Sequence, residues 1–147
     1  MIKKSLFVSL IGLFLCVVPG HSQQWQHSWN EATALAQKEH KHILLNFSGS
    51  DWCLLCMRMH KNIFGSNQFI TFASQNLVLY DADFPRNKKN QLSKELERQN
   101  NTLADKYNSA GHFPCTVLLD DNGKVLKQWD SAYTGTPESF IAEIKSL

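Results

Sequence analysis

The feature that most constrains this chain is a short apolar stretch followed by a polar turn and two closely spaced cysteines. Residues 43–47 form a mostly apolar run bounded by turn-forming residues, which predicts a buried β-strand. The next four residues interrupt that pattern, and Ser50 or Asp51 can cap a helix that begins near Trp52. Cys53 and Cys56 are then expected one helical turn apart, on the same face of the helix.

This position has a chemical consequence for both cysteines. N–H groups in the first turn of a helix lack intrahelical partners, and the helix macrodipole places partial positive charge there. Such surroundings can lower the pKa of a thiol from ~8.5 to about 3.5–7.5. Because Cys56 can close a disulfide with Cys53, the pattern predicts a dithiol redox site. Metal sites use the same spacing, so a metal-binding module that uses Cys53, Cys56 and His60, with Met57 and Met59 as soft ligands nearby, stays open as an alternative.

The start of the chain has the pattern of a secretory signal peptide. A basic beginning is followed by an apolar run at 6–18 and by small residues at the two key cleavage positions. We expect residues 1–22 to be removed and residues 23–147 to form one domain. The apolar run is shorter than the ~20 residues that a membrane span needs, so we expect an exported bacterial protein, periplasmic or secreted, whose mature form does not span the membrane.

Charge and cysteine counts narrow the class of protein further. The chain has 15 Lys and Arg and 13 Asp and Glu residues, and without Lys3 and Lys4 the two counts are equal. This balance gives no indication of nucleic-acid binding. Without Cys16, three cysteines remain, which is the count for one pair and one single thiol. We expect the third, Cys115, to be a buried free thiol, with a role as a third redox partner as the alternative.

Hydrophobic periodicity predicts helices and strands in alternation. Leu55, Met59 and Phe64 are expected to face inward from the helix that carries the cysteines. The predicted elements are a loose start at 23–27, a helix at 29–39, a strand at 43–47, a helix at 52–63, a short helix ending at 74, a strand within 76–83, two helices within 88–107 broken near 100–101, a strand at 115–119, a hairpin turn at 121–123, a strand at 124–129 and a last helix after Thr136. This order predicts an α/β fold, with a central mixed sheet of parallel strands and a C-terminal antiparallel hairpin, flanked by helices.

The sequence resembles the thioredoxin superfamily, in particular its secreted, one-domain bacterial members. The resemblance is carried by residues 47–56, 113–120 and 121–125, and it covers the chain from about Trp29 to the C-terminus. It combines Trp-Cys-x-x-Cys with a downstream proline at the head of a strand and a Gly-Lys hairpin. The resemblance implies a thioredoxin-like fold.

The same resemblance implies roles for individual residues. Cys53 would be the exposed attacking thiol and Cys56 the resolving thiol of a redox-active disulfide. Pro114 would follow Phe113 through a cis peptide bond, which occurs in about 5–6% of X–Pro bonds in folded proteins. The loop around that bond would lie beside the dithiol and pair with the substrate backbone, and Trp52 would shield the site.

Three departures from the family pattern stand out. Asn46 occupies the place where well-known members have a buried Asp that helps to deprotonate the resolving thiol, and an amide cannot accept that proton. The residues between the cysteines are Leu54 and Leu55. Residues 84–102 are longer than the usual connection and could form an added surface for partners.

These observations lead to the hypothesis of an exported thiol–disulfide oxidoreductase. Cys53 and Cys56 would reduce or exchange disulfides in protein substrates, and a membrane thiol donor would supply the electrons. We predict no cofactor and no bound metal. The alternatives are the metal-binding module described above and a non-catalytic interaction domain that keeps the thioredoxin fold.

Overall fold

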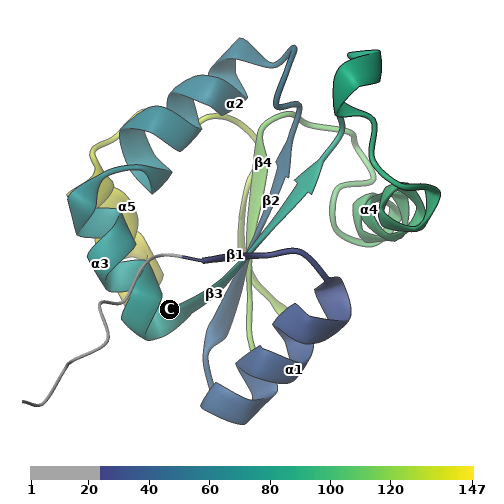
Figure 1. The fold of residues 1–147 in the computed structure, drawn as a ribbon. Coiled ribbons are helices and arrows are strands. Elements are labelled where there is room, and N and C mark those ends of the chain that lie inside the picture. Colours follow the sequence, from purple (N-terminus) through teal and green to yellow (C-terminus); the bar gives the residue numbers. More distant parts are fainter. Residues whose placement is uncertain (1–23) are drawn as a thin grey trace, which may run out of the picture.

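The computed structural model describes residues 24–147, which form a five-stranded mixed sheet with helices on both faces (Figure 1). The cleavable leader predicted at residues 1–22 lies outside the described residues. The strands lie in the order β1-β3-β2-β4-β5; β1, β3 and β2 are parallel, and β4 and β5 are antiparallel to their neighbours. Their bounds are Trp25–Gln26 (β1), His42–Ser48 (β2), Leu77–Asp83 (β3), Cys115–Leu119 (β4) and Val125–Trp129 (β5). This arrangement confirms the predicted α/β fold with a mixed sheet.

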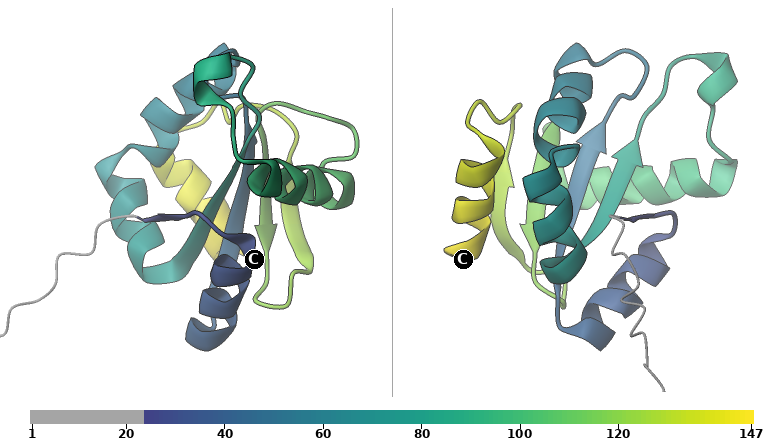
Figure 2. Two further views of the ribbon diagram at one scale, coloured as in Figure 1. Left: turned by 45° about the vertical axis from the view of Figure 1, so that its right-hand side comes forward. Right: turned by 60° about the vertical axis from the view of Figure 1, so that its left-hand side comes forward.

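The helices form one layer on each side of the sheet. They are α1 (Trp29–Glu39), α2 (Leu54–Met59), α3 (Asn67–Asn76), α4 (Lys94–Tyr107) and α5 (Pro137–Lys145), with a π-helical turn η1 (His60–Phe64) and a 3-10 turn η2 (Lys88–Asn90). The helices α1 and α4 cover one face, and α2, α3 and α5 cover the other (Figures 1 and 2). Within residues 24–147, none of the helices combines the length and the apolarity that crossing a membrane requires.

The core consists of two clusters separated by the sheet. Side chains alternate along β2, so Leu45 and Phe47 pack against α1 and α4, whereas Leu44 packs on the other side with Phe69 and Phe140. Both faces of β2 are covered, and its residues from Ile43 onward are buried. Asn46 has the parity of Leu44, so its side chain lies on the face that α2 covers.

The connection between β3 and β4 differs from the prediction. The expected break near residues 100–101 is wrong, because α4 runs without interruption through both asparagines. The Asn100 side chain is buried, accepts a hydrogen bond from the Tyr80 hydroxyl at 2.9 Å and donates one to the Asp83 carbonyl at 3.0 Å. Its amide is therefore satisfied by tertiary partners and does not compete with the helix backbone.

Two other predictions need correction. The loose start at 23–27 contains β1, in which Trp25 pairs with Leu79 and packs its ring against Phe64. Leu55, expected to face inward, is 48% exposed, whereas Met59 and Phe64 are buried as predicted. Leu55 lies in the first turn of α2 beside the exposed Leu54 and Met57, and none of these three side chains belongs to the apolar cluster that contains Met59.

The hairpin and the terminal helices agree with the sequence patterns. Gly123 adopts a φ of 81° in the turn between β4 and β5, a conformation that favours glycine. The Thr136 side chain accepts from the Ser139 N–H, and the Ser139 side chain bonds back, which completes a capping box before α5. Ser28 caps α1 in a similar way, by accepting from the Glu31 N–H.

Candidate active site

Cys53 occupies the N-cap of α2, just before the helical turn in which the sequence pattern places it. Its N–H donates to the Gly49 carbonyl at 2.9 Å, and its sulfur accepts from the Cys56 N–H at 3.2 Å. The prediction that Ser50 or Asp51 caps this helix is therefore wrong, because both side chains bond to other segments. An N–H aimed at the sulfur is the contact that stabilises a thiolate at this position.

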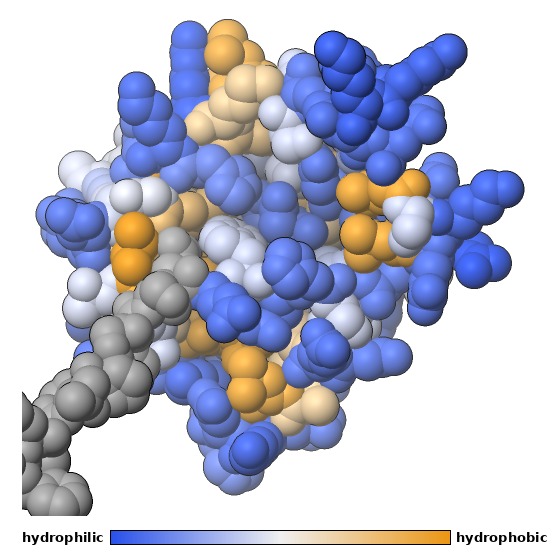
Figure 3. All heavy atoms as spheres, viewed as in Figure 1, coloured by the Kyte–Doolittle hydropathy of each residue, from blue (hydrophilic) through white to orange (hydrophobic). Residues whose placement is uncertain are grey.

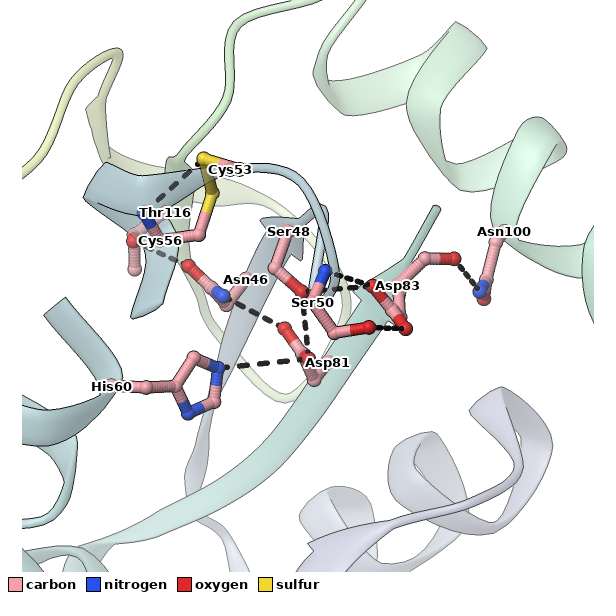
Figure 4. A network of polar contacts seen from close by, with 10 residues as sticks. All are labelled: Asn46, Ser48, Ser50, Cys53, Cys56, His60, Asp81, Asp83, Asn100 and Thr116. Atoms are coloured by element: carbon pink, nitrogen blue, oxygen red, sulfur yellow. Dashed lines mark hydrogen bonds and ion pairs between the residues drawn. A yellow bond between two sulfur atoms is a disulfide. The ribbon is translucent and has the colours of Figure 1, made fainter. Parts of the chain in front are cut away.

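Cys53 and Cys56 form a disulfide, with Cα atoms 5.2 Å apart (Figure 4). Cys53 keeps 6% of its surface exposed and Cys56 only 1%, so Cys53 is the sulfur that an outside partner can approach. The resemblance implied an exposed Cys53 thiol, but the exposed fraction of Cys53 is small in the disulfide state. Leu54, Leu55 and Met57 are exposed apolar residues of the helix that carries the pair. Figure 3 shows apolar surface at the top of the molecule, where α2 lies in Figure 1.

The turn before Cys53 is fixed by two carboxylates. Asp83, at the end of β3, accepts from the Ser50 N–H at 2.8 Å and from its hydroxyl at 2.6 Å. Asp51 accepts from the N–H groups of Arg86 and Asn87, at 2.9 and 2.8 Å. The bond from the Arg86 N–H is the main reason that the pKa of Asp51 is lowered. These bonds join the turn to the segment that follows β3.

The aromatic residue before the dithiol packs against the loop that carries the proline. The peptide bond between Phe113 and Pro114 is cis, as the resemblance implied. The Trp52 ring meets the Phe113 ring edge-on, with centroids 5.4 Å apart. Its indole N–H donates to the Phe84 carbonyl at 2.7 Å, and the Arg86 guanidinium lies 3.8 Å from the ring centroid. Trp52 thus joins the turn, the cis-proline loop and the segment after β3.

Asn46 takes part in a buried polar network beneath the disulfide (Figure 4). Its amide donates to Asp81 Oδ1 at 2.7 Å, and its carbonyl oxygen accepts from the Thr116 hydroxyl at 2.9 Å. The Ser48 hydroxyl donates to Asp81 Oδ2 at 2.8 Å. In Figure 4, Asn46 lies between Cys56 and Asp81. The carboxylate of this network, Asp81, therefore lies on β3, one strand away from the β2 position at which the family pattern has its Asp.

His60 faces the same carboxylate from the start of η1. Its Nε2 lies 3.6 Å from Asp81 Oδ2, and its ring packs against Trp25 and Phe64. Burial lowers the pKa of His60, but the pairing with Asp81 and the charge of Asp83 outweigh that effect, and the net result is a raised pKa. A protonated His60 is thus favoured beside the network.

Sequence reasoning missed the contribution of β3 to this site. Parallel pairing sets Asn46 opposite Asp81 and Ser48 opposite Asp83. The signal was present in the sequence, because Asp81 and Asp83 flank Ala82 at the end of an apolar strand. Two acidic residues on one strand face need partners, and aligning β3 with β2 would have identified Asn46 and Ser48.

The metal-binding alternative finds little support in the geometry. Among residues 24–147, no three His, Cys, Asp or Glu side chains are grouped as metal ligands. His60 points to Asp81, Met59 is buried in the core, and the two sulfurs are bonded to each other.

Cys115 is a buried free thiol at the start of β4, as predicted. It pairs with Phe47 in the sheet, and its sulfur lies 3.9 Å from Asp130 Oδ1. Burial and the nearby Asp130 charge raise the pKa of this thiol to about 12. A thiol that stays protonated and enclosed is a poor nucleophile, which agrees with the interpretation as a structural residue.

Comparison with known proteins adds independent findings to this geometry. A family described as thioredoxin-like domain matches residues 29–147. The disulfide bond reductase DsbH of Chlamydia pneumoniae is 35% identical over 123 residues, which cover 84% of this chain and 71% of that protein. A solved structure of a DsbH oxidoreductase superposes with a TM-score of 0.77 at 34% identity, covering 85% of this chain and 83% of that one.

A second relative shares only part of its length with this chain. The thioredoxin-related protein DsbJ of Chlamydia pneumoniae is 26% identical over 95 residues, which cover 65% of this chain but 26% of that protein.

Proposed function

The chain belongs to the family of thioredoxin-like domains, and from this premise we propose that it is an exported oxidoreductase that reduces disulfides in protein substrates through Cys53 and Cys56. It is a homologue of a protein named as a disulfide bond reductase. The observation that carries the proposal is the Cys53–Cys56 disulfide at the start of α2, beside Trp52 and the cis peptide before Pro114.

The proposed reaction transfers two electrons from the dithiol to a substrate disulfide. The Cys53 thiolate attacks one substrate sulfur, forms a mixed disulfide and displaces the other substrate sulfur as a thiolate. Cys56 then loses its proton and attacks the sulfur of Cys53, which releases the second substrate thiolate. The protein ends with the Cys53–Cys56 disulfide, and both substrate sulfurs end as thiols after protonation.

The surroundings of the dithiol support a protein as the substrate. Three exposed apolar side chains, Leu54, Leu55 and Met57, lie around the disulfide, and such a surface is suited to contact with another polypeptide. Within this proposal, Trp52 and Phe113 pack beside the reacting sulfurs, and the loop at Pro114 holds the substrate backbone.

The proposal also includes a compartment and an electron source. The leader pattern at residues 1–22 supports export, and an oxidising compartment would convert the dithiol to the disulfide. A reductase that works there needs re-reduction after each turnover, and we propose a membrane thiol protein as the donor. Thiol alkylation in intact cells tests this: a largely reduced Cys53–Cys56 pair is expected, and a fully oxidised pair would contradict a supply of electrons.

The central test is a disulfide-reduction assay with insulin as the protein substrate. Wild type should reduce it, and Cys53→Ser should be inactive because the attacking thiolate is gone. Cys56→Ser should form stable mixed disulfides with substrates. Cys115→Ala is the matched control, since it removes a thiol outside the site, and it should retain the wild-type rate. Equal rates for wild type and Cys53→Ser would instead indicate a non-catalytic interaction domain.

The redox potential of the Cys53–Cys56 pair determines the direction of the reaction. A reductase should have a potential of about −270 mV, as thioredoxin has, whereas a potential of about −120 mV is that of a strong oxidant. Equilibration with glutathione or dithiothreitol, followed by alkylation of the free thiols, gives this value directly.

A further inference from the structure

His60 lies one helical turn after the resolving cysteine, and backbone hydrogen bonds hold it there. Its N–H donates to the Cys56 carbonyl, so the two side chains share one face of the helix. Its own carbonyl accepts from the Gly65 N–H at 2.7 Å, which closes the π-helical turn η1. A Cβ atom at position 65 would lie only 3.0 Å from this carbonyl, so glycine suits the close approach. The backbone thus fixes the position of His60 relative to Cys56.

The imidazole of His60 is enclosed by one carboxylate and two aromatic rings. Its Nε2 lies 3.6 Å from Asp81 Oδ2, and the ring centroids of Trp25 and Phe64 lie 5.4 and 5.3 Å from its own. The side chains of His60 and Asp81 keep 38% and 21% of their surface exposed. Because the two rings exclude part of the solvent, the interaction between an imidazolium and the Asp81 carboxylate is stronger than in water.

The net charge beneath the dithiol depends on the proton of this imidazole. Asp81 and Asp83 place two carboxylates at the end of β3, and among residues 24–147 no lysine or arginine forms an ion pair with either of them. Arg58 and Lys61, on the same helical segment as His60, are exposed, and β1 has no charged residue. A protonated His60 therefore offsets one carboxylate, whereas a neutral His60 leaves both charges to oppose the formation of a thiolate nearby.

We propose that the proton of His60, held by Asp81, offsets the negative charge beneath Cys56 and thereby speeds the step in which Cys56 attacks the mixed disulfide. This inference rests on the proposed function, and it makes His60 a positioning residue that acts on Cys56 without touching the substrate. In this step the Cys56 thiol releases its proton to solvent, because His60 already carries one. The thiolate then forms the bond to the Cys53 sulfur, and the substrate sulfur leaves Cys53 as a thiolate.

The contribution of His60 has a defined dependence on pH. Burial acts to lower the pKa of His60, but the pairing with Asp81 and the charge of Asp83 outweigh burial, and the net pKa is raised. Below this pKa the imidazolium is present, and Cys56 loses its proton more readily. Above it the imidazole is neutral, so wild type should behave like a variant with a neutral side chain at position 60.

The test follows the two coloured thiols that are released when the reduced protein reacts with Ellman's reagent. Attack by Cys53 releases the first thiol at a rate that depends on the reagent concentration, and attack by Cys56 releases the second at a rate that does not. Stopped-flow absorbance measures the second release between pH 5.5 and pH 9.5. His60→Gln should slow it about three- to tenfold at pH 5.5, the size expected for a charge about 5–6 Å away in partly solvated surroundings. At pH 9.5 its rate should lie within about twofold of wild type.

Two further variants separate charge from structure. His60→Lys keeps a positive charge beside Asp81 at both pH values, so it should match wild type at pH 5.5 and exceed it by about three- to tenfold at pH 9.5. His40→Gln is the matched control, because His40 also faces a carboxylate, with its Nδ1 3.4 Å from Asp121 Oδ2. It precedes β2, whereas the cysteines follow the other end of that strand, so this variant should have the wild-type rate at every pH.

The outcomes distinguish this inference from the proposed function. If His60→Gln slows the second release equally at all pH values, or not at all, the inference is wrong while the reductase stands. If His60→Lys is as slow as His60→Gln at pH 5.5, the charge at position 60 is not the cause, and the inference is wrong as well. If wild type releases no second thiol and reduces no insulin, the proposed function itself has failed.

Discussion

Swapping the side chains of Asn46 and Asp81 is the most direct test of the polar network under the disulfide. Asn46→Asp alone replaces the donor of the 2.7 Å bond by a second carboxylate facing Asp81, at a buried position. Two carboxylates this close share a proton, and a rise of about two pKa units for one of them corresponds to about 2.7 kcal/mol.

The sign of the pH dependence follows from the raised folded pKa. The unfolded chain loses this proton near pH ~4, whereas the folded chain holds it to a higher pH, so the folded state binds more protons in between. Asn46→Asp should therefore lose stability relative to wild type as the pH rises from about 4 through the folded pKa. Urea denaturation at pH 4.5, 6 and 7.5 measures this loss.

The double variant Asn46→Asp with Asp81→Asn restores an amide–carboxylate pair with its direction reversed. At pH 7.5 it should recover most of the loss, with a coupling energy of about 2–3 kcal/mol in the double-mutant cycle that includes Asp81→Asn alone. It also places the carboxylate beneath Cys56, so the mixed disulfide should resolve faster near neutral pH than in wild type.

Stopped-flow release of a thiol from a preformed mixed disulfide on Cys53 measures that resolution rate. A pH-independent loss of stability for Asn46→Asp, or a double variant no more stable than the single one, would refute the reasoning about the shared proton. An unchanged resolution rate would show that this position has no part in proton transfer.

Three further predictions address separate parts of the fold. His60→Gln should destabilise the protein more at pH 5.5 than at pH 8.5 in urea titrations. A histidine whose pKa is raised on folding stabilises the folded state at pH values below its unfolded pKa, and this contribution is lost as the pH rises through its folded pKa. Equal losses of stability at the two pH values would contradict the pairing with Asp81. Phe140→Ala should cost about 3–5 kcal/mol of unfolding free energy, since its ring is fully buried among aromatic neighbours; under 1 kcal/mol would indicate a loosely packed layer. Cys115, with its pKa raised to about 12, should resist iodoacetamide at pH 8 until the protein is unfolded, as mass spectrometry can verify; rapid native labelling would contradict its burial.

Local sequence patterns predicted most of the helices and strands, because neighbouring residues largely determine where each of these elements begins and ends. The strand at 43–47, the cap at Thr136 and the hairpin at Gly123 each depend on neighbouring residues, and all three are confirmed. Asn100 shows the limit of such reasoning. Its side chain finds partners on β3, so an asparagine that usually marks a helix boundary lies inside a continuous helix.

The same distinction applies to the site. Cys53 and Cys56 and the cis peptide before Pro114 were accessible from motifs and from resemblance. The partnership of Asn46 with Asp81 depends on which strands pair and in what register, and no single stretch contains that information. The N-cap position of Cys53 was missed for a related reason, because Asp51 is committed to Arg86 and Asn87 far along the chain.

The two carboxylates of the cysteine turn also have a consequence for protein engineering. Asp51 joins the turn at 49–53 to the segment at 84–93, and Asp83 joins the same turn to the end of β3, so the turn and the segment depend on each other for their hydrogen bonds. Grafting the segment alone onto another protein of this fold would leave its backbone N–H groups without acceptors. Homologues with shorter connections should accept it only when both aspartates are transferred together.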